Sequence, residues 1–236
     1  MNYDPLVSIC LCVYNGEKYL AKQLESLSNQ THRNVEIIII DDCSVDESLE
    51  IAIRHSLQDT RIRIIKNEVN LGYVRNFEKA FSLSVGQYIA PCDQDDVWMP
   101  EKLEALVRAI GNSSAVYCDS KLVDAEGSDL GVNISDGRNM YRGNNPWVFV
   151  FGNCVSGHAL MFNRDLLKAL LPFPNIRFHD WWIAFVAASA NGIEYVPRAL
   201  VEYRQHTGSV CDFSSLKKSE NSKSFQVAED YRSRSI

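Results

Sequence analysis

The segment Val35-Glu36-Ile37-Ile38-Ile39-Ile40-Asp41-Asp42 is a nearly unbroken apolar run that ends in two carboxylates. Such a run is typical of a strand in a parallel sheet, because helices cover both faces of that kind of sheet. Residues 6–13 have the same character, and an Asn15-Gly16 break follows them. Two buried strands that end in polar residues therefore predict an α/β fold built on a parallel sheet.

Helical patterns alternate with strand patterns over the first 110 residues. Amphipathic periodicity predicts helices over residues 17–30, 46–56, 73–83 and 100–110. Short apolar runs predict further strands over residues 61–65 and 88–90. This alternation predicts a mostly parallel, Rossmann-like sheet flanked by helices, in which ligands bind beyond the carboxyl ends of the strands.

Polar residues follow three of the predicted strands. They are Tyr14-Asn15, Asp41-Asp42 and Asp93-Gln94-Asp95-Asp96. Because the carboxyl ends of parallel strands meet at one edge of a sheet, we expect these side chains to converge on one crevice.

The second half of the chain is less regular. Residues 127–145 are rich in Gly, Asn, Asp and Ser, which predicts a mobile surface loop. Weaker patterns predict a short helix at 146–151, strands at 157–162 and 200–205, and helices at 164–171 and 181–190. A polar tail over residues 212–236 follows.

Composition limits the class of protein. The chain has 236 residues, 46% of them hydrophobic, which suits one globular domain. Its net charge of −6 argues against a nucleic-acid-binding protein, because such proteins more often have a basic surface. We recognise neither a membrane-spanning apolar stretch nor a secretory signal. The seven cysteines form no C-x-x-C pair, which favours reduced thiols in a cytoplasmic protein. Cys10 and Cys12 are expected to be core residues on one face of a strand.

The acidic segment after residue 92 has several interpretations. Residues 93–104 match an EF-hand at its ends, but Val97 and Trp98 occupy positions that need an oxygen ligand and a glycine, which excludes that loop. No phosphate-binding P-loop, Gly-x-Gly-x-x-Gly or His-Glu-x-x-His motif is present. Asp41-Asp42 alone would also suit a receiver domain or a phosphatase, although the second half would then have no role.

Asp93 and Asp95 form an Asp-x-Asp pair at a strand end. Carboxylates in this arrangement suit Mg²⁺ or Mn²⁺, which complete their coordination with phosphate oxygens. The alternative is an acidic turn before a helix that starts at Pro100, with Asp96 as a helix cap or a supporting residue.

Several ordered motifs together resemble glycosyltransferase family 2, which has the GT-A fold. They are Val13-Tyr14-Asn15-Gly16, Ile40-Asp41-Asp42-Cys43-Ser44-Val45-Asp46, Asn70-Leu71-Gly72, Asp93-Gln94-Asp95-Asp96-Val97-Trp98, His179-Asp180-Trp181-Trp182 and Tyr203-Arg204-Gln205-His206. The Asp93 to Trp98 motif resembles bacterial rhamnosyltransferase-like members. The resemblance implies a nucleotide-sugar-binding half over residues 1–115 and a metal-binding, acceptor-binding and catalytic half over residues 116–211 of the same domain.

The resemblance implies a nucleotide site made of Tyr14, Asp42, Arg75 and Asp93. Asp42 would accept a hydrogen bond from the N3–H of uracil or thymine, and Tyr14 would pack near the base. The alternatives are turn chemistry for Asp42, a core position for Tyr14 and a solvated ion pair for Arg75.

The same resemblance implies that Asp95, Asp93 and His206 hold Mn²⁺ or Mg²⁺. It also implies that Asp180 is the base that takes the proton of the acceptor hydroxyl, with a helix cap as the alternative role. His179, Trp181 and Arg204 are expected near the acceptor or the diphosphate.

The implied activity is an inverting, metal-dependent transfer of a sugar, with rhamnose the first candidate, from a UDP- or dTDP-linked donor. The implied acceptor is a hydroxyl of a polysaccharide or a lipid-linked glycan at the inner face of a bacterial membrane, which a cytoplasmic or peripheral enzyme would reach. Two other hypotheses remain open: a non-catalytic nucleotide-sugar-binding subunit or sensor, and a transferase that needs a further C-terminal part.

Overall fold

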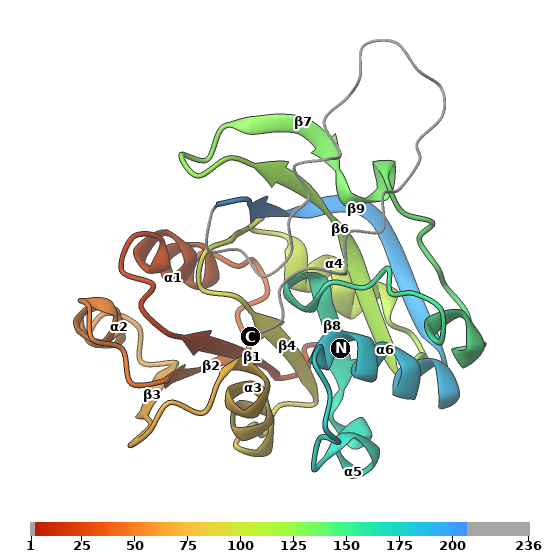
Figure 1. Cartoon of the computed structure of the whole chain (residues 1–236), viewed down its shortest axis with the longest axis horizontal. Coiled ribbons are helices and arrows are strands. Elements are labelled where there is room, and N and C mark those ends of the chain that lie inside the picture. The colour runs from red at the N-terminus through yellow and green to blue at the C-terminus, as the bar shows by residue number, and fades with distance from the viewer. Residues whose placement is uncertain (1–2, 207–236) are drawn as a thin grey trace.

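The structure is a computed structural model, and it describes residues 3–206 (Figure 1). The strands in this range are β1 (Val7–Val13), β2 (Val35–Asp41), β3 (Ile62–Lys66), β4 (Tyr88–Cys92), β5 (Val97–Trp98), β6 (Ala115–Val123), β7 (Asp129–Asn133), β8 (Leu160–Asn163) and β9 (Ile193–Arg204). The helices are α1 (Leu20–Ser28), α2 (Ser48–Ser56), α3 (Tyr73–Ser82), α4 (Lys102–Ala109), α5 (Leu167–Leu170) and α6 (His179–Ser189).

All of the described strands form one sheet in the order β3-β2-β1-β4-β8-β6-β9-β5, with β7 paired to β6. β1 pairs in parallel with both β2 and β4, and β2 pairs in parallel with β3. The predicted parallel sheet of the first half is therefore confirmed. The helix predicted from Pro100 begins two residues later, at Lys102.

Helices cover both faces of the sheet, as Figure 1 shows for α1 and α3 on opposite sides of β1. Successive residues of β1 point to opposite faces, so Ile9 and Leu11 pack with α1 and α4 while Cys10 and Cys12 pack with α3 and α6. The two cysteines are core residues, as predicted, and burial holds the pKa of both thiols well above the ordinary value. The sheet is thus buried on both faces, which explains its continuous apolar strands.

The second half contains two features that the sequence patterns did not predict. β6 lies inside the sheet and pairs with β7, β8 and β9. The prediction of a mobile loop over residues 127–145 is wrong, because β7 and the 3-10 turn Ile134–Asp136 lie within it. Val132 and Ile134 pack with Leu122 in a small core that fixes this segment against β6.

β9 is longer than predicted and pairs with β6 in a register that is interrupted twice. Cys118 faces Val196, but Asp119 faces Ala199, so two residues of β9 bulge outward at Pro197 and Arg198. A proline fits there because it has no N–H to give to the sheet. After the second interruption Val123 faces Arg204. The Arg204 N–H donates to Asp96, so the end of β9 lies beside the acidic segment.

Within residues 3–206 no helix is long and apolar enough to cross a bilayer. The predicted tail over residues 212–236 lies outside the described residues.

Candidate active site

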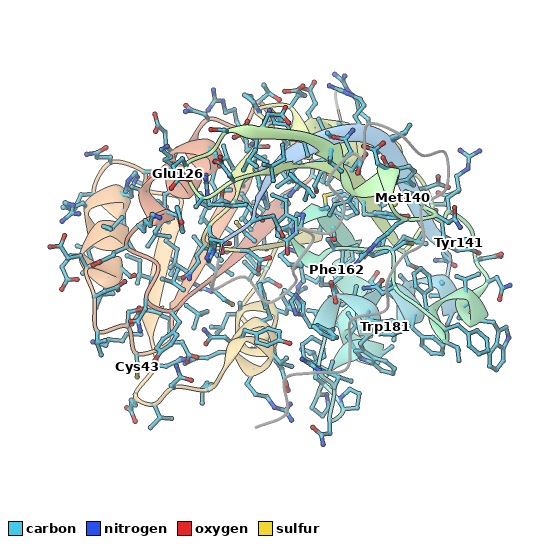
Figure 2. The ribbon with its side chains drawn as sticks, turned by 45° about the horizontal axis from the view of Figure 1, so that its top comes forward. Cys43, Glu126, Met140, Tyr141, Phe162 and Trp181 are labelled. Atoms are coloured by element: carbon cyan, nitrogen blue, oxygen red, sulfur yellow. The ribbon has the colours of Figure 1, made fainter. Side chains whose placement is uncertain are left out.

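A cleft of about 380 Å³ opens beyond the carboxyl ends of β1, β2 and β4. This is the volume range of small-molecule sites and the place where open α/β sheets bind ligands. Eight of the residues predicted for the site line it: Tyr14, Asp42, Asp93, Asp95, His179, Asp180, Trp181 and His206. The expectation that the strand ends converge is therefore confirmed. Figure 2 shows Trp181 on the α6 side of the molecule and Cys43 at the opposite end.

At one end of the cleft, Asp42 organises the loop between β3 and α3. Its Oδ1 accepts from Asn67 Nδ2 at 2.6 Å and from the Leu71 N–H at 2.8 Å, and its Oδ2 accepts from the Gly72 N–H at 2.9 Å. A carboxylate has about four acceptor positions. One position, on Oδ2, is therefore left for a ligand.

We expect Asp42→Asn to destabilise the fold, because the amide turns one accepting oxygen into a donor that faces other donors. A hydrogen bond to a charged group contributes about 1.5–3 kcal/mol, so the melting temperature should fall by roughly 5–10 °C for a chain of this size. Thermal unfolding measures this change. Asp165→Asn, at a side chain that is 86% exposed, is the matched control and should melt like the wild type. An unchanged melting temperature in Asp42→Asn would contradict this role.

Tyr14 lies beside Asp42 with its side chain exposed in the cleft. Gln94 holds its backbone, since Gln94 Oε1 accepts from the Tyr14 N–H at 2.9 Å and Gln94 Nε2 donates to the Tyr14 carbonyl at 3.1 Å. A Cβ at Gly16 would lie 2.5 Å from Gln94 Oε1, so the glycine is required for this contact. Gln94 thus joins the ends of β1 and β4 and leaves the phenol ring free to face a ligand.

The acidic segment presents Asp95 to a histidine from the other end of the chain. Asp95 Oδ2 lies 2.8 Å from His206 Nε2, and both side chains are only about one fifth exposed. Asp93 lies two residues earlier in the same cleft wall. Two carboxylates and one imidazole are a donor set that suits Mn²⁺, and these residues therefore fit a divalent cation.

A second set of donors shares Asp93. Oxygen atoms of Asp93 and Asp96 and a ring nitrogen of His158 all lie within 4.8 Å of one another. Asp96 is fully buried, and its Oδ2 has no hydrogen-bond partner. Its Oδ1 accepts from the Arg204 N–H at 3.1 Å, and α4 begins six residues later, so the predicted helix-cap role of Asp96 is wrong.

The charge of the acidic segment is partly offset by Lys102. This lysine is fully buried, donates to the His158 carbonyl at 2.6 Å and lies 3.0 Å from the centre of the Trp98 ring. Burial lowers its pKa to about 8. Although 41% of the Asp93 side chain remains accessible from the cleft, the enclosing walls raise the pKa of Asp93, and the charges of Asp95 and Asp180 raise it further. A cation would relieve this repulsion.

Asp180 lines the same cleft from the first turn of α6, and its charge acts on Asp93. Burial raises its pKa to about 6, although it accepts from the Trp181 N–H at 2.7 Å. The N-cap position belongs to Phe178, but Asp180 satisfies the Trp181 N–H in the first turn of α6, so a role at the helix start and a role as a base are compatible. A carboxylate with a pKa near neutrality is suited to accept a proton from a substrate.

His179 is 6% exposed and stacks on Phe77 with ring centres 4.1 Å apart. Neither of its ring nitrogens has a hydrogen-bond partner, and burial lowers its pKa to about 3. The imidazole thus packs as a neutral aromatic ring.

We expect His179→Phe to stabilise the fold by about 1 kcal/mol, which is roughly 2–4 °C in melting temperature, because the substitution removes two unpaired polar atoms. His32→Phe is the matched control: His32 is equally buried, but its Nε2 contacts the Pro5 carbonyl at 2.8 Å, so this variant should melt lower. Thermal unfolding of both variants is the measurement. A lower melting temperature in His179→Phe would show that its ring nitrogens do have partners.

Two predicted residues lie away from the cleft lining. Arg75 pairs with Glu78 on α3 and donates to the Phe173 carbonyl. Arg204 is 2% exposed, and its guanidinium donates to the backbone carbonyls of Asp95, Asp124 and Ala125. Arg204 therefore ties the end of β9 to the acidic segment and to the turn between β6 and β7.

The sequence model of the family "Glycosyl transferase family 2" matches residues 8–171, which is more than half of the chain. The chain belongs to glycosyltransferase family 2.

Curated relatives of this family 2 chain carry names of the same kind. An uncharacterised glycosyltransferase of Haemophilus influenzae is 29% identical over 87% of this chain and 67% of its own length. The putative glycosyltransferase EpsH of Bacillus subtilis is 34% identical over 87% of this chain and 62% of its own length. The chain thus spans about two thirds of the length of these relatives.

Solved structures of similar fold are GT-A glycosyltransferases, which confirms the predicted fold class. TarS of S. aureus in complex with UDP-GlcNAc superposes with a TM-score of 0.67 at 21% identity, over 86% of this chain and 59% of that one. The mannosyltransferase PcManGT from Pyrobaculum calidifontis in complex with GDP-Man and Mn²⁺ gives 0.65 at 16% identity, over 86% and 57%. At these identities the likeness concerns the fold.

The cleft of this family 2 chain contains a cation that sequence reasoning missed. Arg138 lines the wall near Asp180 and is the only Lys or Arg among the described lining residues. Burial raises the pKa of Asp180 and lowers that of His158, and the charge of Arg138 opposes the first shift and adds to the second. Arg138 lies in the connection that follows the 3-10 turn Ile134–Asp136, and the sequence pattern around it carried no signal of a site.

Proposed function

We propose that this chain transfers a sugar from a UDP- or dTDP-linked donor to a hydroxyl group, with inversion at the anomeric carbon. The observation that carries the proposal is the placement of three kinds of group in one cleft. Asp42 and Tyr14, which form the proposed nucleotide end, line this cleft together with the Asp95–His206 pair and Asp180.

The nucleotide end suits a uracil or thymine base. The N3–H of either base is a donor, and the remaining acceptor position of Asp42 Oδ2 would receive it. Cytosine has no N3–H and would leave the carboxylate unpaired. The exposed Tyr14 ring would pack against the base.

Asp93, Asp95 and His206 would hold Mn²⁺ or Mg²⁺ in this proposal. When bound, the ion neutralises the diphosphate that leaves the sugar. Arg75 and Arg204 are assigned to positioning the α3 segment and the acidic segment, since both bond to protein groups there. Asp93 remains assigned to both the nucleotide and the ion.

Asp180 would act on the acceptor. Its carboxylate takes the hydroxyl proton as the acceptor oxygen forms its bond to the anomeric carbon, while the bond from that carbon to the diphosphate oxygen breaks on the opposite side. One displacement with one base gives inversion. Trp181 lines the same wall and would pack against the acceptor sugar, with His179 supporting the wall from behind.

We assign residues 1–115 to donor binding and residues 116–211 to the ion, the acceptor and the base. The proposed acceptor is a polysaccharide or a lipid-linked glycan at the inner face of a bacterial membrane, which the enzyme would reach from the cytoplasm. Rhamnose is the first sugar to test.

A donor panel tests the proposal. Purified protein with Mn²⁺ is incubated with UDP-glucose, UDP-GlcNAc, UDP-galactose and dTDP-rhamnose, and release of the nucleoside diphosphate is measured. We expect release from a UDP- or dTDP-linked donor and none from the GDP-mannose control. Tight binding of a donor without release, even with glycan acceptors, would instead favour a nucleotide-sugar sensor or a non-catalytic subunit.

A further inference from the structure

A group of exposed apolar side chains lies at one edge of the molecule. They belong to the 3-10 turn η2 (Pro146–Phe149) and the two residues after it. The exposed fractions are 69% for Trp147, 39% for Val148, 47% for Val150 and 92% for Phe151. We call these four residues the apolar tip.

The apolar tip is held in place by the fold. Phe149, between its members, is 2% exposed and contacts the edge of the Tyr141 ring. The Asn145 side chain accepts from the Trp147 N–H at 3.1 Å, and Pro146 occupies the first position of the turn. Buried Phe149 therefore anchors a turn whose other large side chains face outward.

Such exposure indicates a surface that contacts a partner or a membrane when the protein functions. Isolated exposed apolar residues, such as Leu57 at 81% and Val85 at 62%, are ordinary on protein surfaces. At the tip, by contrast, four large exposed apolar side chains lie within five consecutive residues, and such clustering is characteristic of an interaction site.

The apolar tip is connected to the rim of the cleft. Trp181 lines the cleft next to Asp180, and its Nε1 donates to the Phe149 carbonyl. Asn153 and Ser156, which follow the tip in the chain, also line the cleft. Figure 2 shows Trp181 and Tyr141, the two aromatic neighbours of the turn, on the same side of the molecule.

The sequence segment that contains the tip differs in charge from the rest of the chain. Residues 137–182 contain five Lys or Arg and two Asp or Glu, a net charge of +3, whereas the remaining residues carry −9. Arg142, Lys168 and Arg177 in this segment are exposed. An exposed Trp and Phe in a segment that also carries exposed basic residues is a composition that suits the interface of an anionic bilayer.

A protein partner fits these observations less well. Stable protein interfaces bury about 800 Å² and 20–30 residues on each side, much more than a tip of four side chains offers. Reversible membrane binding has no such minimum, because its strength rises with the buried apolar area and with the attraction between basic residues and anionic lipids.

We propose that the apolar tip inserts into the headgroup region of an anionic membrane and holds the mouth of the cleft at the bilayer surface. This inference rests on the proposed function, because its benefit is access to an acceptor that is anchored in lipid. The exposed basic residues of segment 137–182 other than those in the cleft, Arg142 first among them because it lies five residues before Trp147, would contact the anionic headgroups.

Vesicle flotation tests this inference on the full chain. The vesicles are phosphatidylcholine alone, or phosphatidylcholine with about one third phosphatidylglycerol. The variants are Trp147→Ser/Phe151→Ser and, as a matched control, Leu57→Ser/Val85→Ser, which removes two equally exposed apolar side chains elsewhere. We expect the wild type and the control to float with the anionic vesicles, and the tip variant to bind at least about tenfold more weakly.

The outcomes separate this inference from the proposed function. Nucleoside diphosphate release is measured in the same samples without vesicles, where the tip variant should match the wild type. Release without flotation would overturn the membrane inference alone, and flotation without release would overturn the proposed activity alone. A concentration-dependent dimer that the tip variant abolishes, seen by light scattering, would assign the tip to a second copy of the chain and overturn the membrane inference.

Discussion

Asp180→Asn should lower the rate of sugar transfer by about 10²–10⁴-fold, which is the usual contribution of a general base. The amide keeps the size of the side chain and the contact with the Trp181 N–H, but it cannot take up the acceptor proton. Nucleotide affinity should change less than twofold. Initial rates and calorimetric titration of UDP or dTDP measure the two quantities.

The control for Asp180→Asn is Asp165→Asn, the same substitution at an exposed carboxylate. The control should transfer sugar at the wild-type rate. If Asp180→Asn retained more than about a tenth of the activity, the base would have to be another group, and the assignment of Asp180 would be abandoned.

The same residue sets a pH dependence. Because burial raises the pKa of Asp180 to about 6, the carboxylate becomes protonated as pH falls through 6, and the wild-type kcat/KM should then fall about tenfold per pH unit. The titration of Asp180 does not itself destabilise the fold, since a carboxyl whose pKa is raised in the folded state favours the fold as pH falls. Burial lowers the pKa of His179 from 6.5 to about 3, which disfavours the fold below pH 6.5, so thermal unfolding at each pH is the control that separates the two effects. A profile that stays flat down to pH 5 would contradict the role of Asp180.

Asp95→Ala should abolish the effect of Mn²⁺ on nucleotide binding. We expect the wild type to bind UDP or dTDP about 100-fold more tightly with Mn²⁺ than with EDTA, and the variant to bind equally weakly in both. The variant removes the carboxylate that faces His206 at 2.8 Å. Calorimetric titration with and without Mn²⁺ gives the comparison, and Asp129→Ala, at an exposed carboxylate of β7, should behave as the wild type.

Asp96→Asn distinguishes the two donor sets around Asp93. An ion held by Asp95 and His206 should survive this substitution, because Asp96 would only support the segment. An ion held by Asp96 and His158 would be lost in Asp96→Asn and kept in Asp95→Ala. If Mn²⁺ did not change nucleotide binding by the wild type, the acidic segment would have no metal-binding role in this reaction and would be an acidic turn of the fold.

The first half of the fold could be predicted because its strands are buried on both faces and are therefore almost purely apolar. β6 escaped prediction although it is equally buried, because it contains Asp119, Ser120 and Lys121. Asp119 accepts from the Ser135 hydroxyl at 2.5 Å, and Ser120 contacts His158 at 2.9 Å. These hydrogen-bond partners come from distant segments of the chain. No local sequence pattern therefore indicates that the polar side chains of β6 are hydrogen-bonded inside the sheet.

The candidate site shows the same division. Asp42, Asp93 and Asp95 follow strands, so strand prediction alone brings them together. Asn67, which bonds Asp42, and Arg138, which lies near Asp180, occupy connecting segments whose placement depends on tertiary contacts. Their roles become visible only when the loops are placed.

The bulge of β9 at Pro197 and Arg198 sets the register in which the end of this strand pairs. It adds two residues to β9 relative to β6, and the second interruption adds one more. As a result Arg204 lies beside Asp96 and His206 lies beside Asp95. Because successive side chains of a strand alternate between faces, deleting one residue from this bulge would turn the His206 position away from Asp95 and move it by about 3.3 Å. The number of residues in an exposed bulge outside the cleft lining thus determines which side chain of the second half meets the acidic segment of the first.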